Sequence, residues 1–376
     1  MIYRSFKKYT PLLVYVAVAL LAFSDSGIQT LILNTIGSHS RILRKIAIFL
    51  LFLKVLGTRY TKKEFFILLP VSLLTLYNYT ICGNNYWIWN ILMIASLKNI
   101  DYSILFKTLF YSTFLGLVTT GLLSFLGIGG VLSITDYFGR GILETRYCFG
   151  MYHPNIWHFT LARCIVFLTL AYASKTNWRN LLLLFIINLA AYRFTASRTG
   201  FLSISCFIII IACAKYAKPF MESRFAKIVL GGGIISLYSF YTFLVVHYIK
   251  TWSPFAIWIS QTFTTGRLTQ AGYYLKFHPL KLWGQRFPDD GTLFDCGFFR
   301  MFFESGWILG ILFTAALLLL IICSLKNNWH EITAATIFIA LYMLFETFPA
   351  TRPSYCIIVF FFAILIFRQK NISSHT

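Results

Sequence analysis

The chain has 376 residues, of which 58% are hydrophobic and only 12% are charged, and its mean hydropathy is +0.72. Soluble domains carry about 25% charged residues, so this composition excludes an ordinary soluble enzyme. The formal net charge is +21. Nucleic-acid binding is not its first explanation, because Lys and Arg collect on the cytoplasmic loops of membrane proteins. We therefore expect a polytopic membrane protein with no nucleic-acid partner.

Apolar segments of about 17 to 25 residues recur along the whole chain, and each is long enough to cross a hydrocarbon core of roughly 30 Å. They are continuously apolar and do not alternate with period two, which favours helices over a barrel. We expect an all-α fold of about twelve transmembrane helices in one domain, residues 1–376, with both termini cytoplasmic and an uncleaved first helix. The predicted helices are 11–31, 41–57, 64–81, 85–98, 104–128, 153–173, 180–193, 199–215, 227–248, 299–323, 332–348 and 354–368.

The two types of basic residue divide between the two faces of this topology. The inner face receives thirteen Lys and five Arg, whereas the outer face receives four Lys and ten Arg. Retention of loops in the cytoplasm requires only point charges, but the planar guanidinium suits bidentate phosphate contact. The division predicts that the functional site lies at the outer face.

The longest interruption of the apolar pattern is the stretch 252–304, with a predicted extracytoplasmic loop at 249–298 between the ninth and tenth helices. His278 and the Asp289-Asp290 pair resemble turns rather than a catalyst or a metal site. The cysteines show no CxxC pair and no Cys/His spacing typical of zinc, so we expect neither a metal nor a cofactor. One disulfide among Cys82, Cys148 and Cys296 stays open.

Three polar clusters border the helices on the outer side. His153-Pro154-Asn155 suits a helix start, either as a cap alone or as a substrate contact. Arg193 and Arg198 flank a turn rich in hydroxyls before another helix, which is a candidate anion site.

The third cluster lies in the 252–304 stretch. Arg267 follows a Thr-Gly turn, and Asp295 and Arg300 stand where the chain re-enters the membrane. A carboxylate at such a boundary is a candidate general base. Glu346 and Arg352 form an ion pair between the last two helices or belong to the cavity. The aromatic residues of the stretch either stack on sugar rings or lie at the membrane interface; they include Trp252, Trp258, Tyr273, Tyr274 and Trp283.

Four motifs in order carry a resemblance to a known family: Gly-Met-Tyr-His153-Pro-Asn155, Thr-Ala-Ser-Arg198-Thr-Gly, Thr-Gly-Arg267, and Asp295-Cys-Gly-Phe-Phe with a later glycine. Together they resemble the bacterial O-antigen and exopolysaccharide polymerases (Wzy-type), which are related to the O-antigen ligases. The motifs cover about residues 140 to 350.

The resemblance implies a glycosyltransferase with a GT-C-like fold in the bacterial cytoplasmic (inner) membrane, acting at its outer face on undecaprenyl diphosphate-linked oligosaccharides. Arg198 and Arg267 match arginines that hold the lipid diphosphate, and Asp295 stands where the ligases carry a histidine that assists the acceptor hydroxyl. These three are the expected catalytic residues. A chain-length regulator is a further candidate partner. The expected substrate-binding residues are Arg193, Arg146, His153, Asn155, Arg300 and Arg352.

The polymerase hypothesis has two alternatives. A ligase of the same chemistry makes one transfer and no ladder of products. A lipid-linked oligosaccharide flippase or transporter also needs outward arginines, but transporters place polar residues near the bilayer midplane and often contain inverted repeats. The predicted helix interiors are almost free of charge, with Arg163 as the main exception.

Overall fold

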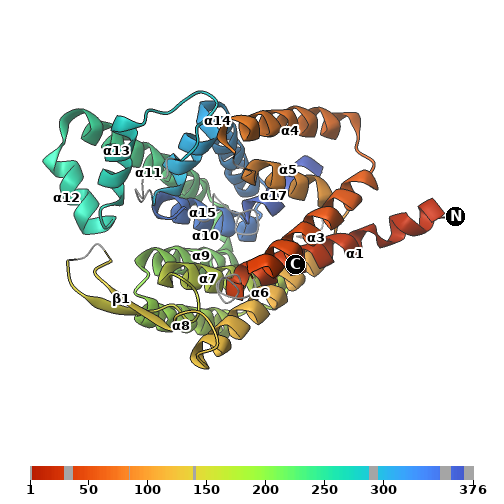
Figure 1. The fold of residues 1–376 in the computed structure, drawn as a ribbon, viewed down its shortest axis with the longest axis horizontal. Coiled ribbons are helices and arrows are strands. Elements are labelled where there is room, and N and C mark those ends of the chain that lie inside the picture. Colours follow the sequence, from red (N-terminus) through yellow and green to blue (C-terminus); the bar gives the residue numbers. More distant parts are fainter. Residues whose placement is uncertain are drawn as a thin grey trace.

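The computed structural model describes residues 2–28, 37–83, 85–138, 141–287, 295–347 and 357–367. It is an all-α fold (Figure 1) in which each of the twelve predicted segments contains a helix. These helices are α1 (Ile2–Phe23, continued by a π-helix at Ser24–Ile28), α3 (Gly37–Leu56), α4 (Lys62–Cys82), α5 (Tyr86–Ser96), α6 (Tyr102–Phe125), α7 (Pro154–Ala171), α8 (Trp178–Thr195), α9 (Arg198–Tyr216), α11 (Arg224–Thr251), α14 (Gly297–Lys326), α15 (His330–Phe345) and α17 (Ile358–Phe367).

Six of the described helices are long and apolar enough to cross a membrane. Each offers at least 18 residues of high mean hydropathy, in α1, α4, α6, α9, α11 and α14. Three apolar helices, α5, α15 and α17, have only 10 to 17 residues. The fold is therefore that of an α-helical membrane protein, and the count of twelve spans stays a prediction.

Helix α15 lies at the centre of the bundle (Figure 1) and packs against α9 and α14. Nearly all of its side chains are buried, including Phe338 and Tyr342. A helix that is apolar all round is stable only where protein surrounds it, which explains its central place. This placement brings the residue that follows α15 into the middle of the molecule.

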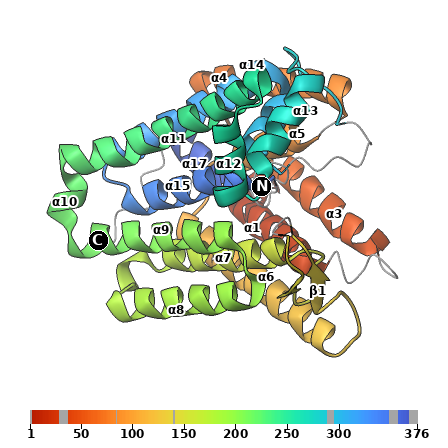
Figure 2. The same cartoon turned by 90° about the vertical axis from the view of Figure 1, so that its left-hand side faces the viewer.

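The bundle has two distinct ends in Figure 2. The short helix α10 (Lys218–Glu222) joins α9 to α11 at one end. The opposite end carries a two-stranded hairpin of β1 (Ser133–Asp136) and β2 (Glu144–Tyr147). The hairpin is antiparallel, with Ile134 opposite Arg146. The sequence analysis did not predict it, because strands of four residues are too short for a period-two pattern to be recognised.

The predicted loop at 249–298 is largely folded. It contains α12 (Pro254–Phe263) and α13 (Arg267–Phe277), which pack against each other and against α11. Ser253 caps α12, and Gly266 adopts φ 85° at the start of α13, where a glycine makes the turn without strain. Helices of 10 and 11 residues with mixed polarity give too few turns for a clear helical pattern, so the sequence indicated a loop.

The chain after α13 is held by a kink in α14. Gly306 has φ 78° and ψ 174°, outside the helical region. A Cβ at Gly306 would lie 2.2 Å from the backbone nitrogen of Gly284, so only glycine permits this approach. Asn78 of α4 donates from Nδ2 to the carbonyl oxygens of Trp283 at 2.8 Å and Ser305 at 3.2 Å. Segment 281–287 is thus fixed between α4 and α14.

Candidate functional site

A cavity of about 770 Å³ opens at the hairpin end of the bundle. Its walls come from the hairpin, the starts of α7, α9 and α13, Asp295 two residues before α14, and the end of α15. The charged and polar residues that line it are Asp136, Arg146, His153, Asn155, Arg198, Thr199, Ser203, Thr265, Arg267, Gln270, Asp295, Glu346 and Thr347. The structure therefore brings most of the predicted site residues, distant in sequence, into one cavity.

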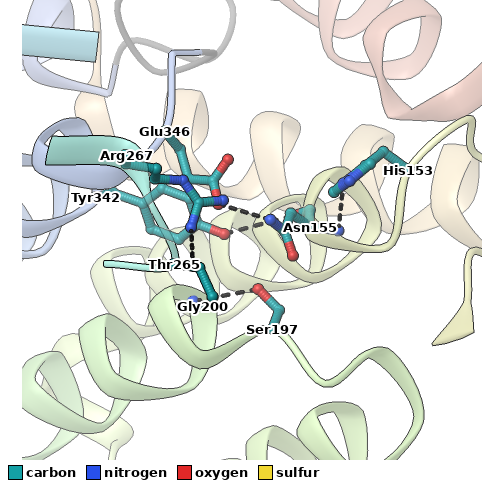
Figure 3. Close-up of polar contacts among 8 residues, drawn as sticks. All are labelled: His153, Asn155, Ser197, Gly200, Thr265, Arg267, Tyr342 and Glu346. Atoms are coloured by element: carbon teal, nitrogen blue, oxygen red, sulfur yellow. Dashed lines mark hydrogen bonds and ion pairs between the residues drawn. The ribbon is translucent and has the colours of Figure 1, made fainter. Parts of the chain in front are cut away.

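The start of α7 supplies His153 and Asn155. His153 is the N-cap, and its Nδ1 accepts a hydrogen bond from the Asn155 backbone nitrogen at 3.2 Å, with Pro154 in the first turn. This confirms the predicted helix start. The Asn155 side chain also donates from Nδ2 to Glu346 Oε1 at 2.6 Å (Figure 3). In this motif His153 caps the helix, and Asn155 contacts another residue of the cavity.

The turn between α8 and α9 supplies Arg198 as the first residue of α9. Ser197 caps the helix by accepting a hydrogen bond from the Gly200 nitrogen at 3.4 Å. His158 of α7 lies beneath this turn: its Nδ1 is 2.8 Å from Thr195 Oγ1, and a Cβ at Gly200 would lie 2.8 Å from its ring. The buried imidazole therefore fixes the turn that carries Arg198.

Arg267 opens α13 and points toward the centre of the site (Figure 3). Its Nη1 donates to Thr265 Oγ1 at 3.0 Å, and its Nη2 donates to Glu346 Oε1 at 2.9 Å. Nε is buried and has no hydrogen-bond partner within the described chain. The guanidinium lines the cavity, where its positive charge can attract an anion.

Glu346 follows α15 and is only 2% exposed. Its partner in the structure is Arg267 of α13, whereas the sequence suggested Arg352, which lies outside the described residues. Burial, and to a lesser extent Asp295, raises the pKa of Glu346 to about 7 against the opposing effects of Arg267 and Asn155. Burial lowers the pKa of Arg267, but Glu346 and Asp295 more than compensate, so it lies above the usual value.

Asp136, Arg198 and Asp295 are charged groups of the cavity without an ion-pair partner among the residues that the structure describes. Arg198 is exposed, and Asp295 stands just before α14. Neither forms a salt bridge in the described part of the chain. His153 has a pKa lowered to about 4 by burial, so its imidazole is neutral near pH 7. Arg198 is thus the one cation of the cavity that no described ion pair holds, and Asp136 and Asp295 are its unpaired carboxylates.

Arg146 lies on the hairpin side of the cavity in a different environment. Its Nε and Nη2 donate to Glu144 Oε2 at 3.0 and 2.7 Å, and its guanidinium lies 3.9 Å from the centre of the Phe138 ring. The ion pair neutralises most of its charge, and the ring covers one face. Arg146 therefore shapes the wall more than it attracts an anion.

Two predicted substrate-binding residues lie outside the cavity. Arg193 is exposed on α8 and is absent from the cavity wall. Arg300 donates from Nε to Glu304 at 2.7 Å and stacks on Phe287, with 4.4 Å between the guanidinium and the ring centre. Arg193 lies in the last turn of α8 and Arg198 begins α9, so the two residues belong to different helices. Arg300 is held by Glu304, the acid one turn later on the same helix.

The aromatic residues named in the 252–304 stretch do not line the cavity. Trp252, Trp258 and Tyr273 are exposed, whereas Tyr274 is buried. Other rings line the cavity, including Tyr137, Phe138, Tyr152, Phe263 and Phe345. Cys82, Cys148 and Cys296 are free thiols, so the disulfide left open does not form.

Comparison with protein-family models, with curated proteins and with solved structures finds no match for this chain. The resemblance to the Wzy-type polymerases therefore depends on the four motifs alone, and family membership stays a prediction.

Proposed function

We propose that this protein is a polysaccharide polymerase of the GT-C kind. It transfers a growing glycan from undecaprenyl diphosphate onto a lipid-linked oligosaccharide repeat unit at the outer face of the bacterial cytoplasmic membrane. The observation that carries the proposal is the convergence of Arg198, Arg267 and Asp295 on one cavity. Each of the three heads or precedes a different helix, α9, α13 or α14.

The chemistry of a lipid diphosphate donor fits this set of groups. The donor brings its own leaving group, so the protein must stabilise the charge that develops on the diphosphate and orient the incoming hydroxyl. Arg198 and Arg267, which both line the cavity, suit the first task, helped by the N-termini of α9 and α13. The Asp295 carboxylate, without an ion-pair partner in the described chain, suits the second by accepting a hydrogen bond from the hydroxyl.

The proposal is tested with lipid-linked repeat units isolated from source cells that lack this chain. Purified wild-type protein should convert them into a ladder of products that differ by one repeat unit. Arg198→Ala and Arg267→Ala should abolish the ladder while the proteins remain folded. Arg179→Ala is the matched control, because Arg179 is an exposed arginine on α8 outside the cavity, and it should leave the ladder intact.

Three results would contradict the proposal. An undiminished ladder from both cavity variants would remove their roles in binding the diphosphate. A single transfer to a different acceptor would indicate a ligase. Movement of labelled lipid across liposome leaflets without a change in mass would indicate a transporter.

A further inference from the structure

The two oxygens of Glu346 have different surroundings. Oε1 accepts both hydrogen bonds of the carboxylate, from Asn155 Nδ2 at 2.6 Å and from Arg267 Nη2 at 2.9 Å. Oε2 accepts none from the residues that the structure describes. A carboxylate so removed from water is stabilised only when its acceptors are filled, so a group that enters the cavity is the expected partner of Oε2.

From this geometry we propose that Glu346 is the proton acceptor of the transfer reaction. The inference rests on the proposed polymerase function and adds a catalytic residue to it. The acceptor hydroxyl donates its proton to Oε2 while its oxygen forms the bond to the anomeric carbon of the donor sugar. The bond between that carbon and the diphosphate oxygen breaks, and the diphosphate leaves with the electron pair. The result is a protonated Glu346 and a free lipid diphosphate.

Glu346 is better oriented for this step than Asp295. Two donors from different helices, α7 and α13, hold Oε1, so the direction of Oε2 is fixed before substrate binds. Asp295 forms no hydrogen bond or ion pair within the described residues. A catalytic group held by its neighbours needs no reorganisation during the reaction, which favours Glu346 as the base and leaves Asp295 to position the hydroxyl.

Proton transfer to Glu346 also changes what Arg267 can do. In the resting protein, Nη2 of Arg267 is held by the Glu346 carboxylate. Protonation removes the negative charge of Glu346 at the moment when negative charge develops on the diphosphate. The positive charge of Arg267, which lines the cavity, is then no longer balanced by Glu346 and can stabilise the leaving group.

The charged and titratable groups around Glu346 agree with a base that works near neutral pH. They are Arg267 on α13, Asp295 before α14 and Tyr342 one turn earlier on α15. The pKa of Glu346 is raised to about 7, chiefly by burial. A base of this pKa is largely deprotonated at pH 8 yet basic enough to accept a proton.

The test compares wild type with Glu346→Gln. Glutamine keeps an oxygen that accepts from Asn155 and Arg267, but its amide cannot accept a proton. We expect undecaprenyl diphosphate to bind the variant within about twofold of wild type, and the extension rate to fall about 100-fold or more. The wild-type rate should rise with pH through about 7, and the residual rate of the variant should lack this rise. Glu222→Gln, on α10 far from the cavity, is the control and should behave as wild type.

Each outcome decides one of the two proposals. If the wild-type protein does not lengthen the glycan at all, the polymerase function is wrong, and the role of Glu346 as base is wrong with it. If wild type extends the chain and Glu346→Gln keeps more than a third of the rate, only the base role is wrong. If the variant loses undecaprenyl diphosphate binding in proportion to its rate, Glu346 serves only to position Arg267.

Discussion

The cations at the two ends of the bundle have different surroundings. At the α10 end, Lys215 Nζ donates to the carbonyl oxygen of Ala173 at 3.0 Å and to that of Thr176, both just beyond the end of α7. At the hairpin end, Arg267 meets a buried carboxylate and keeps one donor unfilled. A point charge is enough to satisfy carbonyls at a helix end, whereas a planar fork is suited to phosphate. The comparison separates cations that stabilise the fold from cations that are available to a ligand.

The largest effect should come from Arg267→Ala. Its removal leaves the Glu346 carboxylate buried without its cation, which should lower the free energy of unfolding by about 3 to 5 kcal/mol and reduce extension by at least 100-fold. Thermal unfolding and the extension assay measure the two effects. The double variant Arg267→Met with Glu346→Gln should recover the stability and not the activity. Recovered activity would show that Arg267 serves only the fold.

The contribution of Glu346 to the stability of the protein should fall as pH rises. Glu346 has a folded-state pKa of about 7, above its ordinary value of 4.5, so the folded protein binds more protons than the unfolded chain between these values. Its contribution is present below about pH 4.5 and is lost as pH rises through about 7, with a size on the order of 3 kcal/mol. The free energies of unfolding of wild type and Glu346→Gln, measured between about pH 4.5 and 7, test this contribution. An identical pH dependence in the two proteins would contradict the raised pKa.

Arg198→Ala should weaken the binding of undecaprenyl diphosphate by about 10- to 100-fold with little change in stability, because this guanidinium is exposed and forms no ion pair in the described chain. Arg198→Lys should recover part of the affinity, since it restores the charge without the fork. Titrations of each protein with undecaprenyl diphosphate at two salt concentrations measure these affinities. Equal affinity in wild type and Arg198→Ala would exclude Arg198 from the anion site.

The smallest effect should come from Lys215→Met at the α10 end. Loss of the ammonium leaves carbonyl oxygens of residues 173 and 176 without this donor, which should lower the free energy of unfolding by about 1 kcal/mol. Extension per folded molecule should not change. A loss of rate as large as that of Arg198→Ala would remove the contrast between the two ends.

Sequence reasoning located the helices well, because continuous apolar runs are a strong signal for helices in a membrane. It also predicted helices from 153 and from 199, close to the observed N-caps His153 and Ser197. The short helices α12 and α13 were not predicted, since their positions depend on packing against α11 rather than on a repeating apolar pattern.

The sequence predicted the arginines of the candidate site, but it did not predict which acid forms an ion pair with Arg267. Arg198 and Arg267 stand in recognisable turns, but the partner of Arg267 is 79 residues away and is set by the central position of α15. The sequence signal for Glu346 was an acid in an otherwise apolar segment. This signal did not identify Arg267 as its partner, and the nearby Arg352 was the partner suggested. No local pattern distinguishes Arg193 from Arg198, because only the helix break between them decides which one faces the cavity.

The central claim is that this cavity transfers a glycan from one lipid diphosphate to another lipid-linked unit. Mass analysis of the products, with undecaprenyl diphosphate quantified in parallel, tests it most directly. Wild-type protein should release one undecaprenyl diphosphate for each repeat unit added, and Arg267→Ala should release none. Release of undecaprenyl diphosphate without chain growth, or lipid movement without release, would contradict the account.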